Sequence, residues 1–382
     1  MGLERLLLAS IVAMSISPCI LLPLASSEEI FPEAEGPTAE SSDELWLGSG
    51  PPPRVVDVED YGTRANGCDD TEAFLAAWRE ACNSSDYRSV FLVPEGKRYL
   101  LMPIKGTLEA PSNRSVWLDR NLQEWITFEG IDRLHVLGGG TLNGNGQQWW
   151  TNSCKLNRSM AIYFRRCTHL VVEDLEVRDS MQMHVAIAYS WNVLVSKLFI
   201  AAPGWSPNTD GIHVSNSKEV SISDCTISTG DDCVSIVTGS MFVRVTGIFC
   251  GPGHRISIGS LGANNSWAHV SDVLVEKATL LGTTNAFSED HIVKVQIINV
   301  IGKRGRNNGS AIAVRNIHYR NIYGTSASKV AINFICSEAV RCDGIQMQDI
   351  YLVGEGRYAT CSYRNATVAQ LGYNFPFCSA EM

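Results

Sequence analysis

Three stretches of the sequence decide the fold: Asp210-Gly211-Ile212-His213-Val214, Asp232-Cys233-Val234-Ser235-Ile236 and His254-Arg255-Ile256-Ser257-Ile258. Each begins with an ionisable residue and then alternates apolar and polar residues, which is the pattern of a half-buried β-strand. They follow one another at intervals of 22 residues, and similar stretches begin at Met160 and His184. A fixed period of this length indicates a repeat architecture.

A second kind of apolar stretch lies between these copies. It spans residues 171–177, 193–199, 220–227, 243–249, 273–280 and 345–352. Turns but no helical patterns separate the strands, and a single coil could not bury its apolar side alone. We therefore predict an all-β fold, a β-solenoid in which stacked coils share a continuous interior. A large β-sandwich would also contain short strands, but the regular period favours the solenoid.

The N-terminal region divides into three expected parts. Residues 1–25 contain an early basic residue, a mostly apolar run and small residues suited to cleavage, which is typical of a signal peptide. A membrane anchor is the alternative, but Pro18 and two serines interrupt the apolar run. Residues 26–53 are rich in Ser, Glu, Gly and Pro, so we expect a low-complexity linker or propeptide. Residues 54–382 then form one domain.

A short helix is expected at the start of this domain, over residues 70–81. Asp70 can cap it, and its apolar residues fall on one stripe. These are Ala73, Phe74, Ala77, Trp78 and Ala81. The helix is expected to cover the end of the solenoid.

Composition excludes some functions. The net charge of −9 argues against a nucleic-acid binder, although an anionic substrate could still bind a local basic pocket. Twelve cysteines fit an oxidising compartment, and none forms a CxxC pair, so zinc is not expected. Cys19 lies in the signal peptide, which leaves an odd number and at least one cysteine without a partner in the chain. Six sequons suit a secreted glycoprotein: Asn83, Asn113, Asn157, Asn264, Asn308 and Asn365.

Four ionisable residues are expected to meet on the outer surface of this solenoid. Residues one coil apart lie about 4.8 Å from each other, the spacing of paired strands. Asp210, Asp231, Asp232 and His254 stand at the start of three successive copies. Glycoside hydrolysis requires one carboxylic acid to protonate the leaving oxygen and one carboxylate to activate water. Crowded carboxylates raise the proton affinity of at least one of them, so the cluster suits this chemistry.

The sequence around these residues resembles a known family. Asn208-Thr209-Asp210, Gly230-Asp231-Asp232 and Cys250-Gly251-Pro252-Gly253-His254 occur in this order at coil spacing. Together with residues 206–214 and 256–262, they are similar to the polygalacturonases, family 28 of the glycoside hydrolases, in their plant form. The resemblance extends roughly from Arg54 to Cys378. It implies a right-handed parallel β-helix that hydrolyses α-1,4-galacturonan with inversion, and we favour endo action.

The resemblance also implies a role for each site residue. Asp231 is the expected general acid, and Asp210 and Asp232 are expected to hold and activate water. His254 is expected to orient the cluster, and Asn208 to support it or contact substrate. No metal or organic cofactor is implied. The expected partner is pectin, at the cell wall, for a secreted monomer that does not bind membranes after signal cleavage.

Three disulfide bonds are implied by the same resemblance. They are Cys233–Cys250, beside the expected site, Cys336–Cys342 and Cys361–Cys378.

The chain departs from the family pattern at two places. Arg255 follows the motif histidine, where the family usually has glycine. It could crowd the site, bind a uronate carboxylate, or point to the other side of the strand. After Asn285 the family has a Gly-Val-Arg-Ile-Lys coil that binds the substrate carboxylate. Residues 286–309 preserve only a lysine and a glutamine, and Lys294 is the candidate substrate-binding residue.

We therefore expect the chain to be short by one coil or more, and two further hypotheses follow. The chain could be a catalytically impaired β-helix that binds pectin or a partner protein. It could also cleave a related backbone such as rhamnogalacturonan. A mispredicted gene model or an alternative transcript would also produce the abrupt change in sequence.

Overall fold

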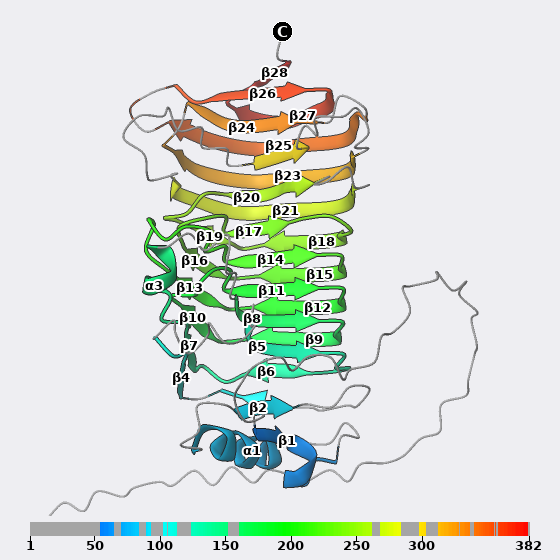
Figure 1. Ribbon diagram of the computed structural model, residues 1–382. Coiled ribbons are helices and arrows are strands. Elements are labelled where there is room, and N and C mark those ends of the chain that lie inside the picture. Colours follow the sequence, from blue (N-terminus) through cyan, green and yellow to red (C-terminus); the bar gives the residue numbers. More distant parts are fainter. Residues whose placement is uncertain are drawn as a thin grey trace, which may run out of the picture. The chain divides into compact units, whose positions relative to one another are not determined.

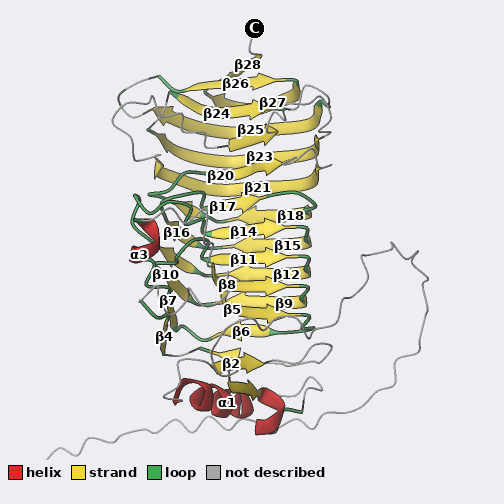
Figure 2. Ribbon diagram, viewed as in Figure 1, coloured by secondary structure: helices red, strands yellow, loops and turns green. Residues whose placement is uncertain are grey.

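In a computed structural model of the chain, the described residues form a stack of β-strand coils with a small amount of helix (Figures 1 and 2). The structure describes residues 54–64, 70–83, 89–92, 102–104, 106–112, 124–151, 160–261, 268–283, 298–302, 312–327, 329–336, 340–354, 356 and 358–380. The expected signal peptide and linker therefore lie outside the described residues. None of the helices in the described part of the chain is long and apolar enough to cross a bilayer.

The N-terminal part of the domain forms a small helical layer. Strand β1 (Arg54–Asp57) pairs in parallel with β2 (Ser89–Leu92), and the 3-10 helix η1 (Val58–Tyr61) follows β1 directly. Helix α1 (Thr71–Asn83) packs against β1, β2 and β3 (Met102–Pro103), and confirms the predicted helix. Phe74 and Ala77 of the predicted apolar stripe are buried. The interior of the stack is thereby covered at this end.

One face of the stack is a ten-stranded parallel sheet. Its strands, in spatial order, are β5 (Glu124–Glu129), β8 (Met160–Arg165), β11 (Val185–Ala188), β14 (Ile212–Ser215), β17 (Val234–Ile236), β20 (Ile256–Leu261), β22 (Ile298–Gly302), β24 (Val330–Ile335), β26 (Thr360–Arg364) and β28 (Cys378–Ala380). Consecutive strands of this sheet are one coil apart in the chain.

The other faces belong to a sixteen-stranded sheet with two columns. The first column is β3 (Met102–Pro103), β6 (His135–Leu137), β9 (Thr168–Glu173), β12 (Trp191–Ser196), β15 (Lys218–Ser223) and β18 (Met241–Thr246). The second is β4 (Thr107–Glu109), β7 (Thr141–Asn143), β10 (Glu176–Arg178), β13 (Phe199–Ala201), β16 (Thr226–Ser228) and β19 (Phe249–Cys250). The short helix α3 (Gln147–Trp150) follows β7.

The two columns merge from β21 onward. Strand β21 (Ala268–Thr283) pairs with both β18 and β19, and is followed in the sheet by β23 (Ile312–Ser326), β25 (Cys342–Gly354) and β27 (Ala366–Phe375). The chain thus forms the predicted all-β, right-handed parallel β-helix with an N-terminal capping helix. Because β21 pairs directly with β23, the stack is continuous across the region where the family pattern is lost.

The corners between strands explain the repeat that the sequence displays. Between the two columns, one residue per coil adopts the left-handed conformation. These residues are Asp174, Lys197, Asp224, Gly247, Lys277, Asn321 and Asp349. Asp, Asn and Gly tolerate this conformation best, which explains why an Asp, Asn or Gly stands between the apolar pairs of many copies.

Apolar ladders fill the interior. Phe128, Phe164, Ile187, Val214 and Ile236 align through successive pairings of the ten-stranded sheet, and all are almost completely buried. Each such side chain contributes roughly 1.5–3 kcal/mol through burial. The outward residues between them are therefore held in fixed register, and the site residues belong to this outward set or to the loops beside it.

All three expected disulfide bonds are present: Cys233–Cys250, Cys336–Cys342 and Cys361–Cys378. Within the described residues, Cys167 and Cys225 are buried free thiols. Burial raises the pKa of both thiols to about 11, so neither is a reactive thiolate at neutral pH.

Candidate active site

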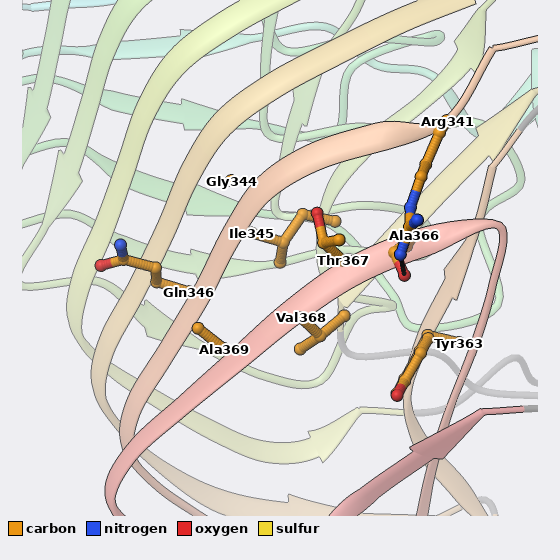
Figure 3. Close-up of a pocket in the computed structure, with 9 residues that line it drawn as sticks. All are labelled: Arg341, Gly344, Ile345, Gln346, Tyr363, Ala366, Thr367, Val368 and Ala369. Atoms are coloured by element: carbon orange, nitrogen blue, oxygen red, sulfur yellow. Dashed lines mark hydrogen bonds between the residues drawn. The ribbon is translucent and has the colours of Figure 1, made fainter.

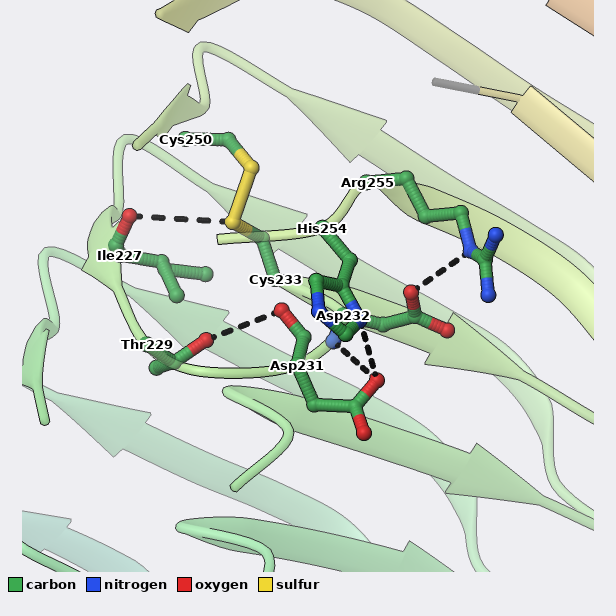
Figure 4. The surroundings of a disulfide bond; sticks show 8 residues. All are labelled: Ile227, Thr229, Asp231, Asp232, Cys233, Cys250, His254 and Arg255. Carbon is green, nitrogen blue, oxygen red and sulfur yellow. Dashed lines mark hydrogen bonds and ion pairs between the residues drawn. A yellow bond between two sulfur atoms is a disulfide. The ribbon is translucent and has the colours of Figure 1, made fainter. Parts of the chain in front are cut away.

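The predicted ionisable residues meet where three loops enter the ten-stranded sheet. These loops connect β13 to β14, β16 to β17 and β19 to β20. Ile212 pairs with Val234, and Val234 pairs with Ile256. Asp210, Asp232 and His254 each precede one of these residues by two positions, so they occupy equivalent places in consecutive coils. Figure 4 shows Asp231, Asp232, His254 and Arg255 together at this point.

Asp231 is surrounded by hydrogen-bond donors. Its Oδ1 lies 2.9 Å from Nδ1 of His254 and accepts the backbone N–H of Asp232 at 2.9 Å. Its Oδ2 accepts a hydrogen bond from Nδ2 of Asn208 at 3.2 Å. Burial raises the pKa of Asp231, but the hydrogen bond and charge of His254 outweigh it, with help from Arg255, and hold this pKa below its usual value. Asp231 is therefore a carboxylate at rest.

Asp232 is held between a cation and a hydroxyl group. Nε of Arg255 donates to its Oδ1 at 2.8 Å, and Oγ of Ser257 donates to its Oδ2 at 2.6 Å. Burial raises the pKa of Asp232, and the nearby charge of Asp231 adds to this effect. Arg255 and Ser257 oppose the rise but do not cancel it. Asp232 thus depends on Arg255 to remain charged.

Asp210 has the most strongly perturbed carboxyl group of the three. Burial raises its pKa well above the usual value, and the charges of Asp231 and Asp232 raise it further. Oγ of Ser235 lies 2.7 Å from its Oδ2 and opposes this rise only in part. Asp210 is therefore the member of the cluster that binds a proton most readily.

Close backbone contacts fix the loops that carry these residues. A Cβ atom on Gly230 would lie 1.9 Å from the carbonyl oxygen of Ser206, so only glycine fits before Asp231. The N–H of Gly230 donates to Oγ1 of Thr209 at 3.0 Å. The Cys233–Cys250 disulfide, visible in Figure 4, joins the loop of Asp232 to the loop of His254. The relative positions of the carboxyl groups are therefore set by covalent and steric constraints.

The structure excludes one of the three interpretations of Arg255. Its guanidinium lies against Asp232, on the same side of the strand as Ser257, so it does not point away from the cluster. Asn208 is also at the cluster, as predicted. Lys294 lies outside the described residues, and the structure does not test its role.

Sequence reasoning missed three residues of the site: His213, Ser235 and Ser257. Nδ1 of His213 lies 2.7 Å from Oγ of Ser235, which in turn contacts Asp210. Ser235 and Ser257 pair directly across β17 and β20. The signal that could have revealed them is their position, since both serines follow the ionisable residue of their copy by three places.

The same groups could offer ligands to a metal ion. Ligand atoms of Asp231, Asp232 and His254 all lie within 4.8 Å of one another. However, His254 already contacts Asp231, and the positive charge of Arg255 lies on Asp232. An adjacent guanidinium opposes binding of a second cation by charge repulsion. The arrangement fits acid–base chemistry better than metal coordination.

A separate pocket lies between β25 and β27, with a volume of about 380 Å³ (Figure 3). The described residues that line it include Arg341, Gln346, Tyr363 and Thr367, and none of these described residues is a carboxylic acid. It therefore lacks the acid and base that hydrolysis of a glycosidic bond requires.

Comparison with known proteins identifies the family. Residues 96–288 and 292–370 match the family described as "Glycosyl hydrolases family 28". A polygalacturonase of Persea americana is 41% identical over 350 aligned positions, which cover 80% of this chain and 75% of that protein. A polygalacturonase of Malus domestica is 41% identical over 377 positions, covering 86% and 80%. The endo-xylogalacturonan hydrolase of Aspergillus tubingensis has a similar fold, with a TM-score of 0.63 at 20% identity, covering 85% of this chain and 93% of that one.

These alignments also agree with the expected shortening of the chain. Eighty per cent of 382 residues is about 306, so roughly 44 of the 350 positions aligned with the Persea americana protein have no residue here. This is close to two coils of about 20–25 residues each. These relatives therefore have residues that find no counterpart in this chain, and β21 pairs directly with β23.

Proposed function

Since this chain belongs to family 28 of the glycosyl hydrolases, we propose that it hydrolyses α-1,4-galacturonan in cell-wall pectin by an inverting, endo-acting mechanism. The observation that carries the proposal is the convergence of Asp210, Asp231, Asp232 and His254 from three consecutive coils. An inverting glycosidase needs an acid on one side of the scissile bond and a water-activating carboxylate on the other.

In this mechanism Asp231 protonates the leaving oxygen, and Asp210 and Asp232 hold and activate the attacking water. His254 orients Asp231 through the contact between Nδ1 and Oδ1. The resting structure adds a requirement, because the contact with His254 holds the pKa of Asp231 below its usual value. A proton must therefore reach Asp231 before the glycosidic bond breaks. Protons in such a cluster belong to the group as a whole, which makes this redistribution inexpensive.

Substrate carboxylates are bound in part by Arg255 in this proposal. Its Nε is anchored on Asp232, which leaves the outer nitrogens of the guanidinium for a bidentate contact with a uronate. Asn208 supports Asp231 from the preceding loop, and Lys294 is retained as a further candidate cation. We also infer that residues 1–25 direct secretion, and that the protein acts as a monomer outside the cell.

The test is an assay of the purified chain on polygalacturonate. We expect release of reducing ends with a faster fall in viscosity than an exo-acting enzyme gives, and products that initially carry the inverted anomeric configuration. Asp231→Asn is expected to abolish turnover. Asp343 is an exposed carboxyl group on β25, so Asp343→Asn serves as the control and is expected to retain turnover.

The result that contradicts the proposal is a folded wild-type chain that cleaves no pectic substrate, whatever its degree of methyl esterification. Binding of polygalacturonate without turnover would then favour the catalytically impaired β-helix. Cleavage of rhamnogalacturonan alone would assign the scaffold to a different backbone.

A further inference from the structure

A chain of hydrogen bonds connects Asp210 through Ser235 to His213 and is not used in the mechanism above. Nδ1 of His213 lies 2.7 Å from Oγ of Ser235, and that Oγ lies 2.7 Å from Oδ2 of Asp210. The side chain of His213 is 18% exposed and that of Asp210 is 13% exposed. Both side chains therefore keep some contact with solvent, and that of His213 keeps slightly more.

We propose that His213 and Ser235 form a proton relay that charges and discharges the Asp210 carboxyl group between catalytic cycles. The inference rests on the proposed hydrolase function, because it concerns the same site. His213 acts through Ser235 and Asp210, so it is a positioning and relay residue and not a catalytic one.

The direction of the hydrogen bonds couples the two ends of the relay. A serine hydroxyl has one proton to donate. If Nδ1 of His213 carries a proton, its N–H donates a hydrogen bond to Oγ of Ser235. The hydroxyl proton of Ser235 can then donate a hydrogen bond to a charged Asp210. If Nδ1 is unprotonated, Ser235 donates to His213 instead, and Asp210 must then donate its own proton to Ser235. A change at one end therefore requires a change at the other.

The transfer is balanced in atoms and charge. When Asp210 is protonated, its O–H bond breaks and a new O–H bond forms at Ser235. At the same time the original O–H bond of Ser235 breaks and an N–H bond forms at Nδ1 of His213. The products are a carboxylate and an imidazolium, which then releases its other proton to water. The relay returns Asp210 to the charged state after it has accepted a proton from the attacking water.

Among the groups described around Asp210, His213 is the best candidate to exchange a proton with its carboxyl group. Asp231 and Asp232 face Asp210 from the β16–β17 loop as carboxyl groups, and Arg255 acts on it only through Asp232. His184 lies below, with Nδ1 3.0 Å from the carbonyl oxygen of Asp210, but it is fully buried and burial lowers its pKa to about 4. Among the residues paired with His213, Ala186 on β11 and Ser235 on β17 carry no charge.

The test combines infrared titration with kinetics. The C=O stretching band of protonated Asp210 is identified as the band that disappears in Asp210→Asn. The pH at which half of this band is lost, the midpoint of the Asp210 titration, is then measured in the other variants. Ser235→Ala removes the hydroxyl and is expected to raise this midpoint by about one pH unit, the size of a lost hydrogen bond to a charged group. His213→Gln, which can still bond to Ser235 but cannot take up a proton, is expected to raise it as well.

The kinetic expectations separate a relay from a structural role. His213→Gln and Ser235→Ala should each lower kcat about tenfold or more at nearly unchanged KM. The double variant should be no worse than either single variant, and Ser235→Thr should restore most of the rate. Ser257→Ala, which removes the equivalent hydroxyl from Asp232, is the matched comparison and should leave the Asp210 midpoint within the range of the wild type.

The outcomes distinguish the relay from the proposed function. An active wild type whose Asp210 midpoint and kcat do not respond to Ser235→Ala overturns the relay alone, as do single effects that add in the double variant. An inactive wild type whose Asp210 midpoint still shifts in both variants overturns the proposed function and leaves the relay in place.

Discussion

The ion pair between Arg255 and Asp232 gives a sharp prediction about stability. We consider Arg255→Gln, which keeps a polar side chain but removes the charge. Asp232 is 12% exposed and Arg255 is 19% exposed, so the substitution leaves a carboxyl group almost buried without its cation. Removing one partner of a buried pair costs about 3–5 kcal/mol. Because both groups retain some contact with water, we expect a value near the lower end, about 3 kcal/mol at neutral pH.

The pH dependence provides a second check on the same variant. Burial already raises the pKa of Asp232, and Arg255 opposes that rise. Without Arg255 the folded-state pKa moves further above the unfolded value of about 3.9. A carboxyl group with a raised folded pKa destabilises the protein as pH rises from the unfolded pKa towards the folded one. The cost of Arg255→Gln should therefore be greatest near pH 7 and should shrink as pH falls.

The measurement is urea unfolding followed by tryptophan fluorescence at about pH 7 and pH 4.5. The control is Lys197→Gln, because the pair of Lys197 with Glu173 is largely exposed, at 64% and 33%. We expect that variant to be nearly as stable as the wild type, because an exposed ion pair contributes little. A cost for Arg255→Gln that matches this control, or that is the same at both pH values, would refute the buried-pair reasoning.

Three further predictions concern the supports of the site. Gly230→Ala should destabilise the protein by about 1–3 kcal/mol and sharply lower activity, because the new Cβ atom would overlap the Ser206 carbonyl. Gly106 has open space around it, so Gly106→Ala should be neutral in the same unfolding and activity assays. Replacing Cys233 and Cys250 together by serine should cost about 3 kcal/mol, because the bond closes a loop of 17 residues; an unchanged urea midpoint would contradict this. His184 is buried with its pKa lowered to about 4, so the unfolded chain binds a proton first and stability should fall as pH drops from about 6.5 towards 4. In His184→Gln, unfolding measured across that range should show a weaker pH dependence.

Much of the fold could be predicted because stacking imposes one repeating pattern. Residues 22 apart pair with each other, so copies such as those beginning at Asp210, Asp232 and His254 reveal their register directly. The merging of two columns at β21 was not predictable in the same way. The corner residue there, Lys277, has the same left-handed conformation as its counterparts, and the apolar pattern on either side does not change.

The sequence could predict which residues form the site, but not how the pKa values of these residues are shifted. Spacing brings the three aspartates together, whereas their pKa values depend on contacts from other loops. His254 lowers the pKa of Asp231, and burial raises that of Asp210. The direction of Arg255 was equally undecided, because it lies just before β20, where strand alternation is not yet established. Only the position of its guanidinium against Asp232 resolves the question.

The construction of the site from adjacent coils has a consequence for how the protein forms during synthesis. Every residue of the cluster lies between Asn208 and Ser257, and its contacts join segments about one coil apart in the chain. Coils that contact only their neighbours can be added one after another as the chain emerges. The catalytic cluster is then complete once β20 has docked, before β21 to β28 exist. The later coils are therefore not needed to assemble the cluster.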